Sequence, residues 1–251
     1  VHTSAQLIGV GGKVFARVPE GDGVTEKVSR ISLDSNGNEL TGNMGDLNVF
    51  SQAPNRGPSV SLDGRFVLFE TRGAVLPIDT NNTADIYLYD RDTDADGIFD
   101  EPGQTGYELI SVDSDENPYP GGSLYAAISQ DPGGRYVAFG TNATNVIPGA
   151  PLTCANRRDS QYGECAITML RDRVLGTTEH ISVGTLGEEP NGDTYPPTVS
   201  ADGRFVAFGS SASNLVAGDT NTCVADYPNP NAGACPDVFV RDRCLAFGVP
   251  V

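Results

Sequence analysis

The chain has 251 residues, with 33 acidic and 16 basic side chains and a formal net charge of −17. This balance disfavours nucleic acid and anionic membrane surfaces as partners, because both attract clusters of Lys and Arg. It is typical of a secreted protein whose carboxylates stay solvated or bind cations. No apolar run approaches the ~20 residues that span a bilayer. Because the sequence starts at Val1 without an initiator Met, we expect a removed signal peptide, a longer precursor or a fragment.

Three copies of one short motif divide the chain into repeats. The copies read SVSLDGRFVLF at 59–69, AISQDPGGRYVAF at 127–139 and TVSADGRFVAF at 198–208. Asp-Gly in the first and third copies, and Gly-Gly in the second, predict a tight turn between two antiparallel strands.

Two further motifs recur along the chain. One contains Asp-Arg and occurs at 84–92, 166–173 and 236–243; the other contains Ile-Ser and occurs at 108–114 and 179–185, and the N-terminal stretch 29–35 matches it. Each motif alternates apolar and polar residues and is rich in Val, Ile, Phe and Tyr, which is the pattern of a half-buried strand. A full repeat therefore predicts four antiparallel strands, and the sequence shows no convincing long amphipathic helix.

The two ends of the chain carry incomplete repeats. Residues 12–18 match the Asp-Arg motif, whereas the third repeat has no clear Ile-Ser strand and residues 245–251 are a poor substitute. An unpaired strand edge can pair with other chains and cause aggregation, so we expect another strand to complete these sheets. Within one chain, residues 12–18 or 26–33 would pair beside 236–243 and close a ring. Alternatively, the same pairing would join neighbouring chains. A third possibility is that the segment belongs to a longer assembly of repeats.

Four-stranded units in tandem most often build a β-propeller. The third repeat, SADGRFVAFGSSASNLVAGDTN from Ser200 followed by DVFVRDR to Arg243, resembles the TolB-like, WD-repeat-like propeller repeat of bacterial exported proteins. The resemblance spans roughly residues 25–243 and implies an all-β propeller, or propeller segment, of about three and a half to four blades. The predicted domain covers 1–251, with a partial blade at 1–57, blades at 58–124 and 125–195, and a last blade at 196–251 that lacks a clear fourth strand.

Four of the five cysteines fall at equivalent positions of two repeats. Cys154 and Cys223 each lie 19 residues after the arginine of their repeat's first motif, and Cys165 and Cys235 follow at offsets of 30 and 31. We expect disulfides Cys154–Cys165 and Cys223–Cys235, and hence an oxidising compartment that is periplasmic, extracellular or at the cell surface. A zinc site is the alternative, although no Cys-x-x-Cys or histidine cluster favours it. Cys244 is left over.

The stretch RDTDADGIFDEPG, residues 91–103, concentrates aspartates in a chain that is already acidic. Asp92, Asp94 and Asp96 alternate, Gly97 permits a sharp turn, and Asp100 follows. This spacing resembles the first nine positions of an EF-hand-type loop, in which alternate carboxylates bind one Ca²⁺.

The same loop departs from the EF-hand at its end. Position 12 is Gly103 rather than a bidentate glutamate, so a last ligand must come from elsewhere. We expect a structural Ca²⁺ held by the three alternating aspartates, the carbonyl of Ile98, and Asp100 either directly or through water. A solvated acidic hairpin is the alternative. A catalytic metal is disfavoured, because no histidine or general base accompanies the loop.

Other candidate chemistry is weaker. The stretch 79–82, DTNN, and its echo at 219–222 could bind calcium, but Asp and Asn there favour turns capped by their own side chains. His2 is terminal, and His180 lies in a predicted strand whose other copies have Leu109 or Arg30 at that place, which indicates a surface side chain rather than a base.

The sequence therefore favours an exported, calcium-stabilised propeller with a binding or structural scaffold role. Protein partners or self-association would use its strand edges. The alternative is a secreted hydrolase that acts on carbohydrate or peptide at the propeller funnel. No spacing singles out a pair of catalytic carboxylates, so an enzyme is the less favoured interpretation.

Overall fold

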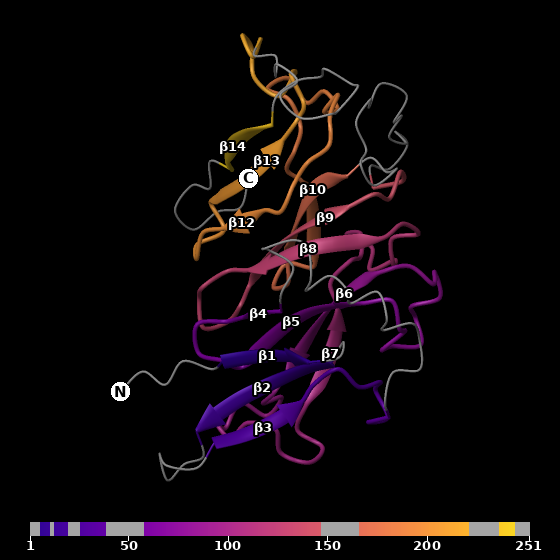
Figure 1. Cartoon of the computed structure of the whole chain (residues 1–251), viewed down its shortest axis with the longest axis vertical. Coiled ribbons are helices and arrows are strands. Elements are labelled where there is room, and N and C mark those ends of the chain that lie inside the picture. The colour runs from indigo at the N-terminus through magenta and orange to yellow at the C-terminus, as the bar shows by residue number, and fades with distance from the viewer. Residues whose placement is uncertain are drawn as a thin grey trace.

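The computed structural model describes residues 6–10, 13–19, 26–38, 58–146, 166–220 and 236–243, with side chains from residue 29 onward. In this part of the chain every regular element is a β-strand and none is a helix (Figure 1). The all-β prediction is therefore confirmed. Nor do the described residues contain a helix long and apolar enough to cross a membrane.

The strands form four sheets, each built from strands that are consecutive in sequence and pair antiparallel. The N-terminal sheet contains β1 (Gln6–Val10), β2 (Lys13–Pro19) and β3 (Glu26–Arg30). The first repeat sheet contains β4 (Ser59–Val60), β5 (Phe66–Thr71), β6 (Asp85–Asp90) and β7 (Gly106–Leu109). The second repeat sheet contains β8 (Ser123–Ile128), β9 (Tyr136–Thr141), β10 (Ile167–Asp172) and β11 (Thr177–His180). The third repeat sheet contains β12 (Thr198–Val199), β13 (Phe205–Ser210) and β14 (Asp237–Asp242).

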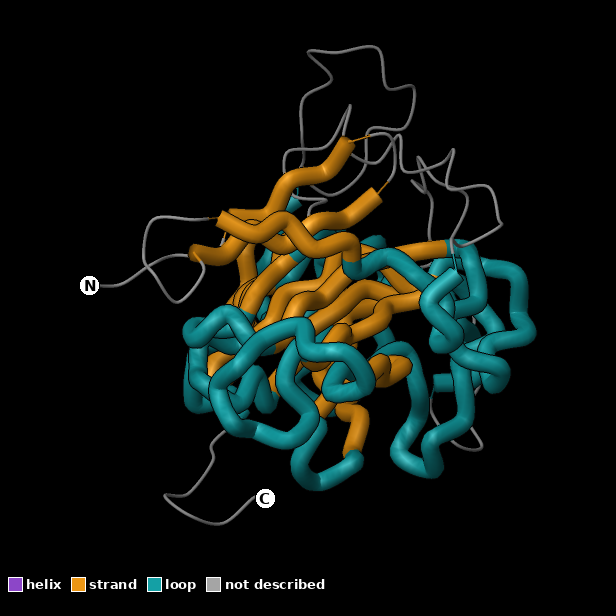
Figure 2. The backbone as a smooth tube through the Cα atoms, turned by 90° about the horizontal axis from the view of Figure 1, so that it is seen from below, coloured by secondary structure: helices purple, strands orange, loops and turns teal. Residues whose placement is uncertain are grey.

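The sheets follow one another along the long axis of the molecule in chain order (Figure 1). Seen along that axis, the strands occupy the centre and the upper part of the view, and the described loops lie mainly below and to the sides (Figure 2). The four-strand repeat predicted from the motifs is confirmed for the first and second repeat sheets. Strand β8 begins at Ser123, two residues before the predicted boundary at 125.

The core lies between the faces of neighbouring sheets. Phe66 and Leu88 of the first repeat sheet pack with Val137 and Met169 of the second in one buried cluster. A second cluster joins the second and third repeat sheets, and a third joins Ile31 to the opposite face of the first repeat sheet. Each large apolar side chain buried in this way contributes roughly 1.5–3 kcal/mol. The prediction that the strands are half-buried is wrong for β9 and β10. Both are buried along their whole length, because neighbouring sheets pack on both faces of their sheet.

Tight turns join the first two strands of each repeat sheet, as predicted. Gly64, Gly134 and Gly203 all have positive φ, at 82°, 49° and 70°. At Gly203 a side chain is excluded on packing grounds too, because a Cβ would lie 2.4 Å from the ring of Tyr136. The Asp-Gly and Gly-Gly signals therefore predicted both the turn and the residue type that fits it.

The predicted closure by the N-terminal strands is not made within this chain. Strands β2 and β3 pair with each other and with β1, whereas β14 pairs with β13. The N-terminal and third repeat sheets lie at opposite ends of the stack (Figure 1). The prediction that 12–18 or 26–33 pair beside 236–243 in one chain is wrong for the described residues. The sequence reasoning missed β1, which gives the N-terminal strands a sheet of their own.

Candidate metal centre

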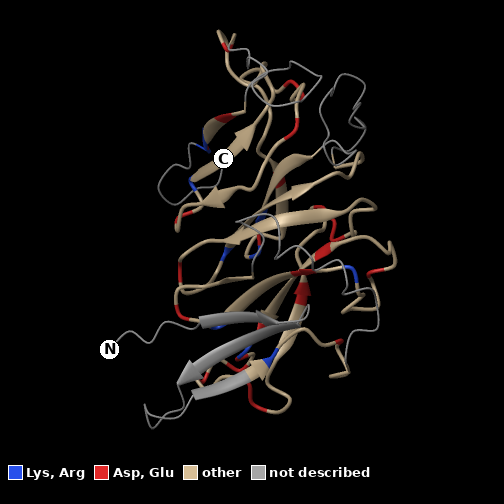
Figure 3. Ribbon diagram, viewed as in Figure 1, with Lys and Arg blue, Asp and Glu red and all other residues tan. Residues whose placement is uncertain are grey.

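The acidic loop connects the third and fourth strands of the first repeat sheet. It covers residues 91–105, between β6 and β7, whereas the matching connection in the second repeat sheet covers only 173–176. Acidic residues occur throughout the described sheets and loops (Figure 3). In the part of the chain that the structure describes, this loop is where three such groups gather closely enough to share one cation.

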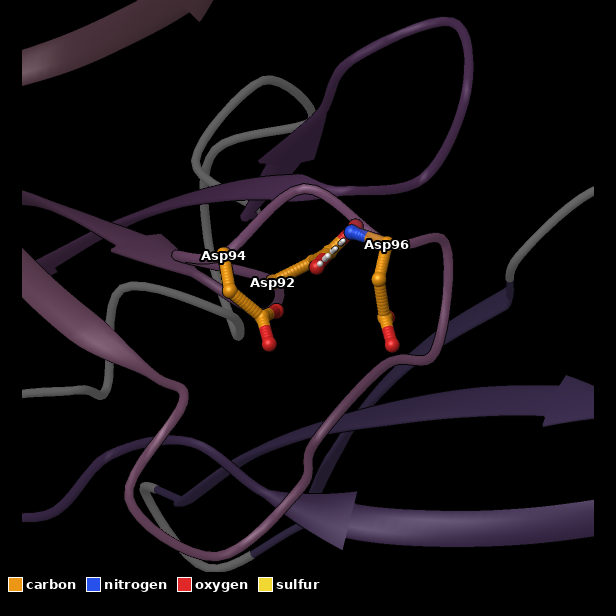
Figure 4. A group of neighbouring side chains, drawn as sticks. All are labelled: Asp92, Asp94 and Asp96. Carbon is orange, nitrogen blue, oxygen red and sulfur yellow. Dashed lines mark hydrogen bonds between the residues drawn. The ribbon is translucent and has the colours of Figure 1, made fainter.

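The three alternating aspartates converge. Asp92, Asp94 and Asp96 each offer a carboxylate oxygen, and these oxygens lie within 4.8 Å of one another. Asp94 and Asp96 are exposed and extend to the same side of the loop, while Asp92 is buried against the backbone (Figure 4). Oxygen ligands from alternate residues in one wrapped loop are the arrangement that Ca²⁺ uses in proteins.

Backbone hydrogen bonds shape this loop. Asp92 accepts from the N–H groups of Asp96 and Gly97 at 3.1 and 3.0 Å, and Asp96 accepts from the N–H of Ile98 at 2.8 Å. Ala95 and Gly97 both have positive φ, at 59° and 89°, so the chain winds tightly around the carboxylates. Part of the carboxylate convergence is therefore built by the loop itself.

The environment separates the pKa values of neighbouring aspartates. For Asp92, desolvation opposes ionisation, but hydrogen bonds from the Gly97 N–H, the Asp94 carboxyl and the Asp96 N–H outweigh it and lower the pKa. Desolvation, the hydrogen bond with Asp92 and the charge of Asp96 raise the pKa of Asp94. Desolvation and the charges of the same three aspartates also raise the pKa of Glu101. A cation bound among these groups would relieve that repulsion.

Asp100 lies against a different partner. Its two carboxylate oxygens accept from Nη2 and Nε of Arg91 at 2.5 and 3.1 Å, and the Arg91 side chain is fully buried. The Arg91 guanidinium also lies over the ring of Phe99, 4.8 Å from its centroid. Of the predicted ligands, the structure therefore brings together the side chains of Asp92, Asp94 and Asp96, and it places Asp100 in an ion pair at the base of the loop. The Ile98 side chain is exposed.

Arg91 belongs to a set of arginines that the sequence analysis did not single out. Arg91, Arg173 and Arg243 each follow the aspartate at the end of the third strand of their repeat sheet. Their Nη1 groups donate to the turn carbonyls of Gly64, Gly134 and Gly203 at 3.0, 2.9 and 2.8 Å, respectively. The threefold Asp-Arg pattern was the signal that could have identified them.

The carboxylate that pairs with this arginine differs between repeats. Arg173 and Arg243 reach back to the fourth strand of the preceding sheet and pair with Glu108 and Glu179, each at 2.8 Å. At the matching place in the N-terminal sheet, three residues before the serine of the Ile-Ser motif, the chain has Ser29. The acidic loop therefore supplies to Arg91 a carboxylate that the preceding sheet does not have at the matching place.

The other residues singled out in the sequence either make structural contacts or lie outside the described residues. Asn81 donates to Asp85 and to the carbonyl of Tyr119, each at 2.8 Å, and accepts from its own loop, so the turn interpretation of 79–82 is confirmed. The Nε2 atom of His180 contacts the Ser182 hydroxyl at 3.2 Å. All five cysteines lie outside the described residues, so both disulfides stay predictions.

No protein-family model and no curated protein matches this sequence. Among solved structures, the chain is similar to TolB from Acinetobacter baumannii, with 16% identity and a TM-score of 0.35 over 79% of this chain and 35% of that one. It is also similar to a putative TolB from Agrobacterium tumefaciens, with 13% identity and a TM-score of 0.36 over 92% and 58%. The chain thus spans 35% and 58% of the lengths of these two proteins. Likeness at this level identifies no family.

Proposed function

We propose that this protein is an exported β-propeller, or propeller segment, that acts as a calcium-stabilised scaffold for binding or assembly. The observation that carries the proposal is the convergence of Asp92, Asp94 and Asp96 in a loop whose base is fixed by Arg91 and Asp100. A structural cation would neutralise the carboxylates and hold the loop to the first repeat sheet.

The donor set suits Ca²⁺ better than Mg²⁺. Ca²⁺ takes six to eight oxygen ligands in flexible geometry, whereas Mg²⁺ demands near-ideal octahedral geometry. Three carboxylates together with the carbonyl of Ile98 and water would satisfy Ca²⁺. Asp100 would contribute through water while it remains on Arg91, because both its oxygens already accept from the guanidinium.

The propeller part of the proposal rests on the repeated junction between sheets. At two successive junctions an apolar cluster and an arginine–glutamate pair recur at equivalent places. Neighbouring blades of a propeller repeat one contact in this way. The export part rests on the acidic composition and on the two equivalent cysteine pairs in the sequence.

Calorimetric titration with Ca²⁺ tests the metal site. The expected result is one site per chain in the unaltered protein and no heat of binding in Asp94→Asn. Asp115→Asn is the matched control, since it makes the same change at another exposed aspartate and should bind as the unaltered protein does. Absence of Ca²⁺ binding in the unaltered protein, or equal loss in both variants, would overturn the proposal.

A further inference from the structure

The chain contains two Asn-Gly pairs, Asn36-Gly37 and Asn191-Gly192. In such a pair the glycine nitrogen can attack the side-chain Cγ of asparagine, because glycine has no Cβ to hinder the approach. A C–N bond forms to give a succinimide, and the side-chain nitrogen leaves as ammonia with the proton of the glycine nitrogen. Water then opens the ring to aspartate or isoaspartate. The reaction needs a carboxamide that can turn towards the glycine and a backbone that can move.

The Asn191-Gly192 pair is held against residues 211–214. Nδ2 of Asn191 donates to the Ser213 hydroxyl at 3.0 Å, and its Oδ1 accepts from the N–H of Ser213 at 2.8 Å. The backbone N–H of Asn191 donates to Oδ1 of Asn214 at 2.9 Å. Gly192 is buried, and a Cβ built there would lie 2.5 Å from the backbone nitrogen of Ala212. Both the carboxamide and the backbone of this pair are therefore fixed.

The Asn36-Gly37 pair lies in an exposed turn after β3. Asp34 organises this turn, because its Oδ1 accepts from the N–H groups of Asn36 and Asn38 at 2.9 and 2.8 Å. Among the hydrogen bonds that lower the pKa of Asp34, the one from the Asn38 side chain is the strongest and the one from the Asn36 side chain is the weakest. Gly37 has a φ of 80°, and a Cβ built there would meet no heavy atom of the described residues within 4 Å, its chain neighbours aside. The Asn36 carboxamide is thus held loosely, and the backbone beside it has room to move.

One backbone hydrogen bond of this turn opposes the attack. The N–H of Gly37 donates to the carbonyl of Asp34 at 2.9 Å, so the turn must open before the glycine nitrogen can react. Exposed turns open locally at a small fraction of the free energy of global unfolding. Loss of one or two such bonds slows the reaction by roughly ten- to a hundredfold relative to an unstructured peptide. Reaction at Asn191 also requires loss of the carboxamide hydrogen bonds and of the packing of Gly192, so it is slower still.

We propose that Asn36 is a site of spontaneous deamidation in the folded protein and that Asn191 is protected. Aspartate or isoaspartate at this place puts a second carboxylate beside Asp34, and isoaspartate also adds a methylene to the backbone of the turn. The N–H of Ser35 donates to the carbonyl of Val75, between β5 and β6, at 3.1 Å. Deamidation therefore weakens the contact between the N-terminal and first repeat sheets as the protein ages. The inference goes beyond the scaffold role and requires neither calcium nor a partner.

Peptide mapping by mass spectrometry tests the proposal on the intact chain. The protein is incubated in mildly alkaline buffer, both folded and in urea, and the conversion of each asparagine is followed with time. In the folded protein Asn36 should convert and Asn191 should stay intact. In urea both should convert at similar rates, since each is followed by glycine and neither keeps its surroundings. An intact Asn36 in the folded protein, equal conversion of the two asparagines there, or a slow Asn191 in urea would overturn the proposal.

Two variants test which contacts control the rate. Asp34→Ala removes the acceptor that organises the exposed turn, and it should speed conversion of Asn36 by a few-fold without changing Asn191. Ser213→Ala removes the hydroxyl that binds Nδ2 of Asn191, and it should speed conversion there by a similar factor without changing Asn36. Equal changes at both sites in each variant, or none at either, would contradict the assigned contacts.

Discussion

The first and second repeat sheets share strands and tight turns but differ in the connection between their third and fourth strands. Residues 91–105 form this connection in the first sheet, and residues 173–176 form it in the second. The short connection leaves Arg173 to pair with Glu108 of the neighbouring sheet, whereas the long one brings Asp100 to Arg91. An insertion that carries the candidate metal ligands thus also replaces an ion pair between sheets by one within a sheet.

The comparison predicts that removing the carboxylate partner of the arginine lowers the free energy of unfolding by different amounts in the two repeats. Asp100→Ala leaves the fully buried Arg91 without its counter-charge, and loss of one partner of a buried pair costs about 3–5 kcal/mol. Glu108→Ala affects a more exposed pair and should cost about 1 kcal/mol or less. Urea unfolding of both variants measures the free energy of unfolding. Equal losses would break the distinction between the two junctions.

A compensating substitution tests whether Asp100 takes the place of a glutamate that the preceding sheet does not have at this position. Ser29→Glu introduces a carboxylate at the place that Glu108 and Glu179 occupy in the next two sheets. Combined with Asp100→Ala, it should restore part of the lost free energy of unfolding, while in the unaltered protein it should have little effect. If the double variant is no more stable than Asp100→Ala alone, Asp100 does not stand in for a missing glutamate.

The two repeats also differ at the start of the third strand. The first has the buried Asp85 where the second has Ile167. Desolvation raises the pKa of Asp85 from 3.8 to about 6, against hydrogen bonds from Ser111 and Asn81 that lower it. Between these values the folded state holds a proton that the unfolded state releases. Stability from this group is therefore full below the unfolded pKa and is lost as pH rises through about 6.

Replacing the buried carboxylate should remove that dependence. The raised pKa corresponds to about 3 kcal/mol of stability lost on going to neutral pH. Asp85→Asn should abolish this part of the pH dependence and raise the free energy of unfolding at pH 7. Asp115→Asn, at an exposed turn, should leave it in place. A variant with an unchanged pH profile would show that Asp85 is not the titrating group.

A smaller difference lies in the turn that follows the fourth strand. Asp113 accepts from the N–H groups of Asp115 and Asn117 at 2.9 Å each in the first repeat, whereas the second has Gly184 there. In the second turn Glu188 accepts instead from the N–H of Leu186 at 2.8 Å. Nδ2 of Asn117 also donates to both oxygens of Asp113, at 3.2 and 3.1 Å. Asp113→Ala should cost about 1 kcal/mol in urea unfolding, since it removes these exposed local hydrogen bonds. Glu188→Ala removes one and should cost less.

The sequence was most informative where a pattern repeats. Three copies of the first motif predicted the strands on each side of Gly64, Gly134 and Gly203, and the positive φ at each glycine follows from local chemistry alone. Alternation in the strands predicted one buried face. It could not show that both faces are covered, because that depends on how successive sheets stack.

The candidate metal site was likewise predicted only where it depends on local sequence. Asp92, Asp94 and Asp96 converge because their own loop winds around them, which their spacing already indicates. Asp100 pairs with Arg91, and comparison with Glu108 and Glu179 shows why: the matching place of the preceding sheet holds Ser29. The spacing of the loop alone does not show that relation between sheets. The pairing of the N-terminal strands with 236–243 was likewise a contact between distant segments, and its prediction within one chain was wrong for the described residues.

The most direct test of the account is unfolding of the intact protein with and without Ca²⁺. Binding to the folded state alone raises the free energy of unfolding by roughly 2.7 kcal/mol at 100 times the dissociation constant. The account predicts a rise of that size with Ca²⁺, its reversal by a chelator, and no response in Asp94→Asn. Identical unfolding curves with Ca²⁺ and with chelator would contradict it and leave residues 91–103 as a solvated acidic hairpin.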